Sequence, residues 1–592
     1  MDTKRQDRPL SILRDLQSET LKKYRNSTEV VGLLIEYNSR EQVLGINNLT
    51  NTSVVVLDNV FAIAFVPFNK ILELAPYVKD ILSLQIPVIY TLEQNSPIEA
   101  SGAPLFHRNP LLQLDGGGVI IGIIDTGIDY LNNEFMKEDG TTRILRIWDQ
   151  TLDFEDQNGV YLAKMGVEYN NDQINEAIMA KENNEDPYAI VKTKDDIGHG
   201  TMVASLIGAR GINPDLTGVA PNCSFVVVKL KEAPLPIIDY AGVNDLSKVG
   251  RYKTVELLLA IRYLTIVLHE IGGPMVVCAA LGTNIGSHDG TNLFEKSFDT
   301  ITAESGVVCV SGVGNEGDTD THTEGKFNIT GEQKIMEIRI GKTQKNLTFQ
   351  IYISHPDKVS IGISSPSGEL IERIPVRLNK IETVFFVYEG TKMRISYIYP
   401  EQYTGDQVIN IEARNIREGI WQFRLYGDYI INGEYWSWLP QRSLLDPDTK
   451  FLSPSQYTTL TIPGTGKGSI TAAYYNQNNN ATMGQSGRGF ARDGRIKPDV
   501  AAGGVNALVT TPGGGTRIIS GSSVATAITA GCCALILDWA IVRKNDPGIY
   551  ATAVKSYLIR GTSMRIGDSY PNPQWGYGTI SMTGVFDALR ES

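Results

Sequence analysis

Short apolar runs alternate with polar residues through the first hundred positions of the chain. Residues 28–37 (TEVVGLLIEY) and 61–67 (FAIAFVP) are typical of β-strands, and residues 69–84 have the apolar spacing of a helix. A last strand-like run covers residues 88–95 and leads into a linker rich in Ser, Gly and Pro. We therefore predict a small βαββαβ-like α+β domain over residues 1–95.

From about residue 117 the apolar runs become continuous. Four such runs lie at residues 118–125, 223–230, 274–281 and 306–314. Continuous apolar runs are typical of strands buried on both faces of a parallel sheet, and residues 254–264 have the pattern of a covering helix. We predict an α/β domain, a parallel sheet with flanking helices, built from two stretches, 96–319 and 456–592.

Between these two stretches the pattern changes again. Residues 320–455 contain many short strand-like runs separated by turns, such as KIMEIRI, NLTFQIYIS, MRISYIYP and IWQFRLYGDYI. Alternating runs of this kind favour an antiparallel sheet with one buried face. We predict that residues 320–455 form an inserted β-sandwich or jelly roll.

Length and charge narrow the functional classes. The chain has 592 residues, which is too many for one hydrophobic core, and a formal net charge of −12. An acidic chain without a Lys/Arg block lacks the basic surface that phosphate contacts need, so we expect no nucleic-acid partner. The N-terminus carries no apolar segment typical of a secretory signal, which on its own indicates a cytoplasmic location.

Cysteines and one long apolar run add two expectations. The five cysteines are odd in number and lie mostly in apolar runs, so we interpret them as buried free thiols: Cys223, Cys278, Cys309, Cys532 and Cys533. Residues 523–542 are long and apolar enough to cross a membrane. Asp538 lies inside this run and Gly531 interrupts it, so we expect a buried central helix and no membrane span.

Three short motifs carry candidate chemistry. Asp125 ends an apolar strand in IGIIDTGID, His199 lies between glycines just before a helical run, and Ser523 opens the apolar helix in ISGSSVATAITAG. Each motif alone is compatible with a structural role. Together they supply a carboxylate, an imidazole and a hydroxyl at strand and helix ends, where α/β enzymes place their sites.

The order Asp, His, Ser and the flanking residues DTGID, GHGT and GSSVA resemble those of the subtilisin-like (S8-type) serine peptidases. His199 follows Asp125 by 74 residues, and Ser523 follows His199 by 324 because of the predicted insert. The resemblance implies a catalytic triad of Asp125, His199 and Ser523. It also implies that Asn315, in GVGNEG, supplies the oxyanion-hole amide.

The same resemblance implies a substrate pocket between two strands, lined by Ala280, Leu281, Gly282, Gly312, Val313 and Gly314. The chemistry of such a peptidase needs no metal or organic cofactor. Calcium sites are frequent in this family, but the sequence assigns no ligands to one.

Longer segments resemble the clostridial spore-germination proteases, the Csp group, over residues 28–592; among them are LGTNIGSHDG and GIWQFRLYGDYIINGEYWSWLP. The resemblance implies a prodomain at residues 1–95, an interrupted subtilase domain and an inserted jelly roll. It implies self-processing, which we place between Thr91 and Ala100, and the prodomain as a partner. It also implies a spore-associated location and, as substrate, the precursor of a cortex-lytic hydrolase. A general clostridial subtilase with another substrate and a non-catalytic germination sensor remain alternatives.

Overall fold

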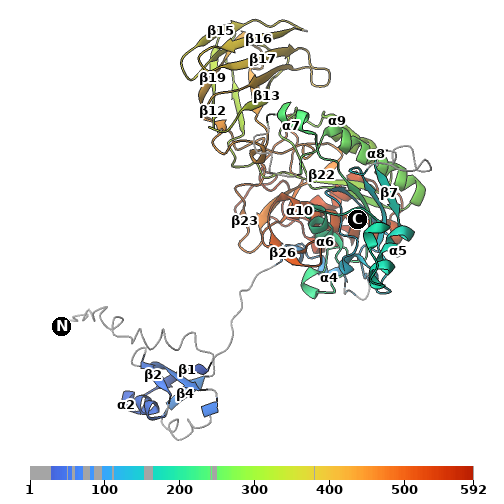
Figure 1. Cartoon of the computed structure of the whole chain (residues 1–592), viewed down its shortest axis with the longest axis vertical. Coiled ribbons are helices and arrows are strands. Elements are labelled where there is room, and N and C mark those ends of the chain that lie inside the picture. The colour runs from blue at the N-terminus through green and yellow to red at the C-terminus, as the bar shows by residue number, and fades with distance from the viewer. Residues whose placement is uncertain are drawn as a thin grey trace, which may run out of the picture. The chain divides into compact units, whose positions relative to one another are not determined.

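The computed structural model describes residues 29–49, 51–56, 60–67, 69–70, 81–85, 96–107, 109, 112–152, 165–240, 242, 250–378 and 380–590. The chain divides into two compact units, Met1–Gln94 and Asn95–Ser592, which we call the N-terminal and the C-terminal unit (Figure 1).

The N-terminal unit contains a four-stranded antiparallel sheet in the order β2-β3-β1-β4. Its strands are β1 (Val30–Tyr37), β2 (Ser53–Val56), β3 (Phe61–Pro67) and β4 (Ile81–Gln85), and a short helix α2 spans Arg40–Leu44. β1 and β3 coincide with predicted strands. The helix predicted over residues 69–84 is wrong at its C-terminal end, because β4 pairs there with β1 and tertiary pairing overrides the local apolar spacing. Residues 71–80 and the strand predicted at 88–95 lie outside the described residues.

The C-terminal unit is built on a sheet in the order β23-β22-β10-β9-β5-β8-β6-β7, with β24 also paired to β22. The strands are β5 (Ile120–Asp125), β6 (Ile144–Asp149), β7 (Val167–Asn170), β8 (Ser224–Lys229), β9 (Met275–Ala279), β10 (Val307–Gly312), β22 (Ser469–Asn476), β23 (Ala481–Thr482) and β24 (Val500–Gly503). The four continuous apolar runs become the adjacent parallel strands β10, β9, β5 and β8, which confirms the predicted α/β fold.

Alternate residues of each central strand face two different helix layers. Ile121 and Ile123 of β5 pack in the core that includes α6 (His199–Gly208) and α10 (Ser522–Leu537), whereas Ile120 and Ile124 pack with α8 (Thr254–Ile271) and α9 (Leu293–Ile301). The remaining helices are α3 (Pro97–Ala100), α4 (Pro104–His107), α5 (Asn171–Glu182), α7 (Leu235–Tyr240), α11 (Ala551–Arg560) and α12 (Met582–Arg590). We call the sheet with these helices the α/β body.

The apolar run at α10 is a core element, as predicted. Ser522–Val542 is long and apolar enough to cross a membrane, but it is 89% buried inside the protein, and no other helix in the described part of the chain meets the same criteria. All five cysteines are free and buried, which agrees with their interpretation as structural thiols.

The insert, residues 320–455, contains two antiparallel sheets that lie together beside the α/β body (Figure 1). One sheet is β11 (His322–Lys326), β20 (Glu434–Trp438), β13 (Asn346–Ile353), β18 (Gln407–Arg414), β17 (Thr391–Ile398) and β16 (Ile381–Phe386). The other is β15 (Leu370–Ile374), β14 (Lys358–Ser364), β19 (Gly419–Tyr429), β12 (Gln333–Ile340) and β21 (Lys450–Phe451). The two sheets share one hydrophobic core, in which Trp421 and Phe423 are fully buried.

Aromatic and charged groups join the insert to the α/β body. Trp438 of the insert stacks on His288 of the body, with ring centroids 4.0 Å apart, and donates from its indole nitrogen to the carbonyl of Thr458. Arg492 of the body forms ion pairs with Asp289 of the body and Asp406 of the insert. Because these groups are almost fully buried, the insert is anchored to the body by a desolvated contact.

Candidate active site

Asp125 is positioned by the end of the central strand β5. Its side chain is 3% exposed, and one carboxylate oxygen accepts a hydrogen bond from the backbone of Thr126 at 2.7 Å. The carboxyl end of a parallel strand in the middle of the sheet places this group at the edge where α/β folds hold their sites.

His199 is the first residue of α6, and its ring bridges Asp125 and Ser523. Nδ1 lies 2.8 Å and 2.9 Å from the two carboxylate oxygens of Asp125, and Nε2 lies 3.0 Å from Ser523 Oγ. The three side chains that the sequence singled out therefore form one hydrogen-bonded chain. A contact with this geometry can move a proton from a hydroxyl to an imidazole whose orientation is held by a carboxylate.

A buried carboxylate, Asp195, holds the two segments that carry Asp125 and His199 in register. It accepts from Thr126 Oγ1 at 2.7 Å and from the backbone of Gly198 at 2.8 Å, and its second oxygen accepts from Thr201. Gly200 makes this close approach feasible, since a Cβ atom there would lie 2.1 Å from the carbonyl oxygen of Gly127. The sequence analysis missed Asp195, although its position four residues before His199 was a signal for such a role.

Ser523 lies in the first turn of α10, and its neighbours connect the helix to β10. The backbone N–H of Ser522 donates to Asn315 Oδ1 at 3.1 Å, and Ser522 Oγ accepts from the backbone of Gly314 at 3.0 Å. The first bond orients the amide of Asn315, whose Nδ2 group makes no hydrogen bond within the described residues. Asn315 and Ser523 line the same cavity, so an amide donor and the first-turn backbone of a helix both face it.

The Asp125 carboxylate is also the main electrostatic influence on His199. It raises the pKa of His199 above the ordinary value of 6.5, and this effect exceeds the opposing effect of burial. The imidazolium that would form during catalysis is thereby stabilised.

The cavity that contains Ser523, which we call the serine cavity, has a volume of about 580 Å³. Of the predicted substrate-binding residues, it is lined by Ala280, Leu281, Gly282, Gly312 and Gly314. The prediction for Val313 is wrong: its side chain is fully buried in the core, because successive residues of an extended segment point to opposite faces.

The serine cavity also contains residues that the sequence analysis did not identify. Glu316 and Asp318 follow Asn315 directly, and five residues come from the insert: Gln441, Arg442, Ser443, Leu445 and Pro447. The motif GNEGD placed two carboxylates next to the predicted oxyanion donor, so the acidic residues had a sequence signal. The insert residues had none, because their approach depends on the tertiary fold.

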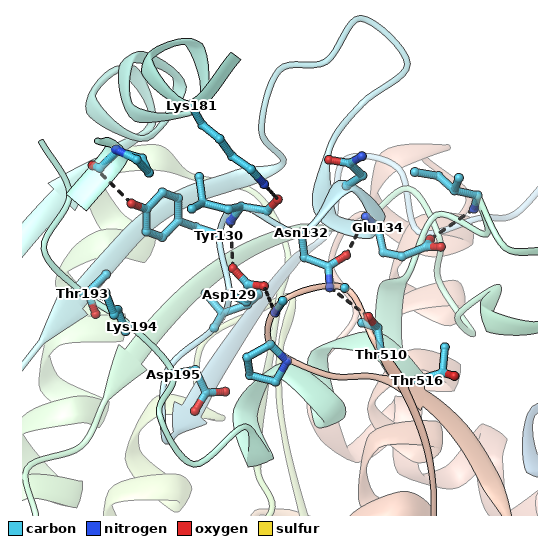
Figure 2. Close-up of a pocket in the computed structure, with 18 of the residues that line it drawn as sticks. Asp129, Tyr130, Asn132, Glu134, Lys181, Thr193, Lys194, Asp195, Thr510 and Thr516 are labelled. Carbon is cyan, nitrogen blue, oxygen red and sulfur yellow. Dashed lines mark hydrogen bonds between the residues drawn. The ribbon is translucent and has the colours of Figure 1, made fainter. Parts of the chain in front are cut away.

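A second cavity, of about 860 Å³, lies on the other side of the Asp195 segment (Figure 2). Figure 2 shows that its walls come from the turn after β5, α5, the segment before His199 and the hairpin of β25 (Ala507–Thr510) and β26 (Thr516–Ile519). Its charged groups are largely engaged within the wall: Lys181 donates to the Leu131 carbonyl, and Asp129 accepts from the backbone of Leu131 and Gly513. Only Asp195 links this cavity to the residues around His199.

Metal binding finds no support in the described part of the chain. No three or more His, Cys, Asp and Glu residues described there are grouped so that they could hold a metal ion. The residues therefore do not fit a calcium site built on such side chains, and the expectation of cofactor-free chemistry stays a prediction.

The family model of the subtilases, Peptidase_S8, matches residues 116–348 and 446–578, two stretches that contain Asp125, His199, Asn315 and Ser523. The chain belongs to the subtilase family. It is therefore a subtilisin-like protease, and its substrate is a protein. The family model does not cover residues 349–445, which lie within the insert.

Among solved structures, this subtilase is similar to the structure of the Clostridium perfringens CspB protease, with a TM-score of 0.73 and 32% sequence identity. The match covers 83% of this chain and 97% of that chain, and it supports a subtilisin-like protease of the Csp type. Sphericase and the protease domain of PatA match with TM-scores of 0.40 at 15% and 12% identity, covering 81% of this chain and 97% and 98% of theirs. No curated protein sequence matches the chain.

Proposed function

We propose that this subtilase is a serine endopeptidase with Ser523 as nucleophile, His199 as general base and Asp125 as the group that orients His199. The observation that carries the proposal is the continuous hydrogen-bonded chain from Asp125 through His199 to Ser523 Oγ, with distances of 2.8 Å and 3.0 Å. The hydroxyl of serine is a weak nucleophile until a base removes its proton, and Nε2 is within reach of that proton.

The reaction follows from these positions. Ser523 Oγ attacks the carbonyl carbon of the scissile peptide bond while His199 Nε2 takes the hydroxyl proton, and Asp125 stabilises the imidazolium. Asn315 Nδ2 and the backbone N–H of Ser523 donate to the oxyanion. His199 then protonates the leaving amine, and a water molecule activated by the same imidazole hydrolyses the acyl-enzyme.

The substrate that the similarity favours is the precursor of a spore cortex-lytic hydrolase, cleaved at a specific bond during germination. The support is the likeness to the CspB protease over almost all of that chain. A spore-associated location belongs to the same proposal. A general subtilase with another protein substrate would hydrolyse peptides but leave the precursor intact, and a non-catalytic sensor would do neither.

The N-terminal unit is proposed as a prodomain that the enzyme removes itself. Ser96 caps α3 and Ile98 is buried in the core of the C-terminal unit, so residues from Ser96 onward belong to that folded unit. A bond cleaved without unfolding α3 must lie before Ser96, in the first half of the interval from Thr91 to Ala100. Residues 91–95 lie outside the described residues. The jelly-roll topology of the insert likewise remains part of the proposal.

An active-site-directed fluorophosphonate and a Ser523→Ala variant test the proposal. The wild-type protein should take up the probe, cleave the precursor and release an N-terminus between Thr91 and Ser96. Ser523→Ala should do none of these, and Ser556→Ala, on the exposed face of α11, should behave like wild type. Precursor cleavage by folded Ser523→Ala protein would refute the triad. Labelling without precursor cleavage would favour a different protein substrate.

A further inference from the structure

The insert takes part in the wall of the serine cavity. After β20 the chain returns to the α/β body, where the backbone of Leu439 donates to the carbonyl of Thr321 at 2.9 Å. Gln441 then donates from its side-chain amide to the carbonyl oxygen of Gly282, and the backbone of Arg442 donates to Glu316 Oε2 at 3.1 Å. Both acceptors lie on segments that line the serine cavity, so the insert is bonded directly to its walls.

The two carboxylates in this cavity differ in their surroundings. Glu316 Oε2 accepts hydrogen bonds from Asn284, Thr319, Thr321 and Arg442. Oε1 of Glu316 accepts none within the described residues and is not fully enclosed. Asp318 is exposed and forms neither a hydrogen bond nor an ion pair in the described part of the chain.

The one cation in the same wall does not neutralise these carboxylates by direct contact. The guanidinium of Arg442 donates to the carbonyl of Thr449 at 2.8 Å and to the carbonyl of Pro447. Its charge is thus directed toward the turn that closes the insert. The cavity therefore offers acceptor oxygens to a ligand, without a side-chain ion pair that a ligand must first break.

Resting on the proposed function, we infer that the insert completes the P1 pocket, and that this pocket selects a P1 side chain that donates hydrogen bonds. A peptide carbonyl attacked by Ser523 and held by Asn315 belongs to the residue whose side chain enters this cavity. A lysine or glutamine side chain would donate to Glu316 Oε1 and Asp318. An aliphatic side chain would leave these acceptors unpaired, and an acidic one would be repelled.

Four peptides that differ only in having Lys, Gln, Leu or Glu at P1 test this inference with the full-length processed protein. The Lys and Gln peptides should each have a kcat/KM about tenfold or more above those of the Leu and Glu peptides, as expected for hydrogen bonds to a charged group. A highest kcat/KM for Leu or Glu in protein that the fluorophosphonate labels at Ser523 overturns the inference alone. Failure to hydrolyse any of the four peptides, together with failure to label, overturns the proposed function as well.

Two substitutions separate the acidic residues from the insert. Asp318→Asn, at an exposed position, should lower kcat/KM for the Lys peptide about tenfold and for the Gln peptide much less, because only lysine loses a charge partner. Gln441→Ala should raise KM for all four peptides roughly twofold to tenfold with kcat unchanged, because it loosens the wall without touching the triad. Tyr388→Ala, an 80% exposed insert residue outside the cavity, is the matched control and should change neither value. An unchanged Lys-to-Gln ratio in Asp318→Asn, or an unchanged KM in Gln441→Ala, contradicts the corresponding half of the inference.

Discussion

Arg492 is the residue whose removal should most weaken the contact between insert and α/β body. Its side chain is 6% exposed and lies 2.8 Å from Asp289 and 2.6 Å from Asp406, which are 9% and 4% exposed. The guanidinium also lies over the rings of Tyr352 and Trp436 of the insert, 5.2 Å and 5.1 Å from their centroids. One buried cation therefore compensates two buried carboxylates, one on each side of the contact.

Arg492→Met keeps most of the apolar stem and removes the charge. It leaves two carboxylates buried without their cation, and breaking a buried ion pair by removing one partner costs about 3–5 kcal/mol. The free energy of unfolding should fall by that amount, measured by urea unfolding followed through tryptophan fluorescence. Limited proteolysis should cut the insert boundaries faster, because local opening becomes more frequent.

An exposed ion pair in the insert supplies the control. Arg377 pairs with Glu382 at side-chain exposures of 56% and 32%, so Arg377→Met should cost no more than about 1 kcal/mol. Adding Asp406→Asn to Arg492→Met should recover part of the loss, since it removes one of the uncompensated charges. If Arg492→Met costs no more than Arg377→Met, the insert is not held by this cluster, and the reasoning from burial is wrong.

Three further predictions concern catalysis and pH. Because His199 must be neutral to accept a proton and Asp125 raises its pKa, kcat/KM should fall as the pH drops through a value above 6.5, and Asp125→Asn should move this acid limb to lower pH while lowering kcat by about 10⁴. Gly200→Ala should lower kcat on a small peptide by about 10² or more, because its Cβ meets the Gly127 carbonyl and displaces His199; an unchanged kcat would contradict the geometry. Burial raises the pKa of Glu295 to about 7, above its unfolded value, so this group should reduce stability by up to roughly 3 kcal/mol as the pH rises from about 4.5 to about 7. Glu295→Gln should remove that slope in thermal unfolding, and an unaltered slope would exclude Glu295 as its cause.

The central sheet and its site were accessible from the sequence for a physical reason. Strands buried on both faces must be apolar throughout, so β5, β8, β9 and β10 are recognisable as continuous runs, and the polar residues at their ends are conspicuous. The N-terminal unit was harder to predict, because β4 is a short segment whose pairing with β1 outweighs its helix-like spacing. Val313 was misassigned because a motif names neighbouring residues together, whereas an extended backbone alternates their directions.

The insert was predicted as a separate layer, and two readings of it were open: a clamp on the α/β body or a recognition element. The contacts show why these readings need not exclude each other. Trp438, which stacks on His288 at the buried contact, is only three residues from Gln441, which donates to the wall of the serine cavity. A segment this short cannot transmit a large displacement of Trp438 without moving Gln441, so loosening the anchor should also disturb the pocket. Arg492→Met therefore separates the cases: a pure clamp predicts lost stability with an unchanged KM for small peptides at a temperature where the variant is folded. A shared structural element predicts that KM rises in the same variant, in the direction expected for Gln441→Ala.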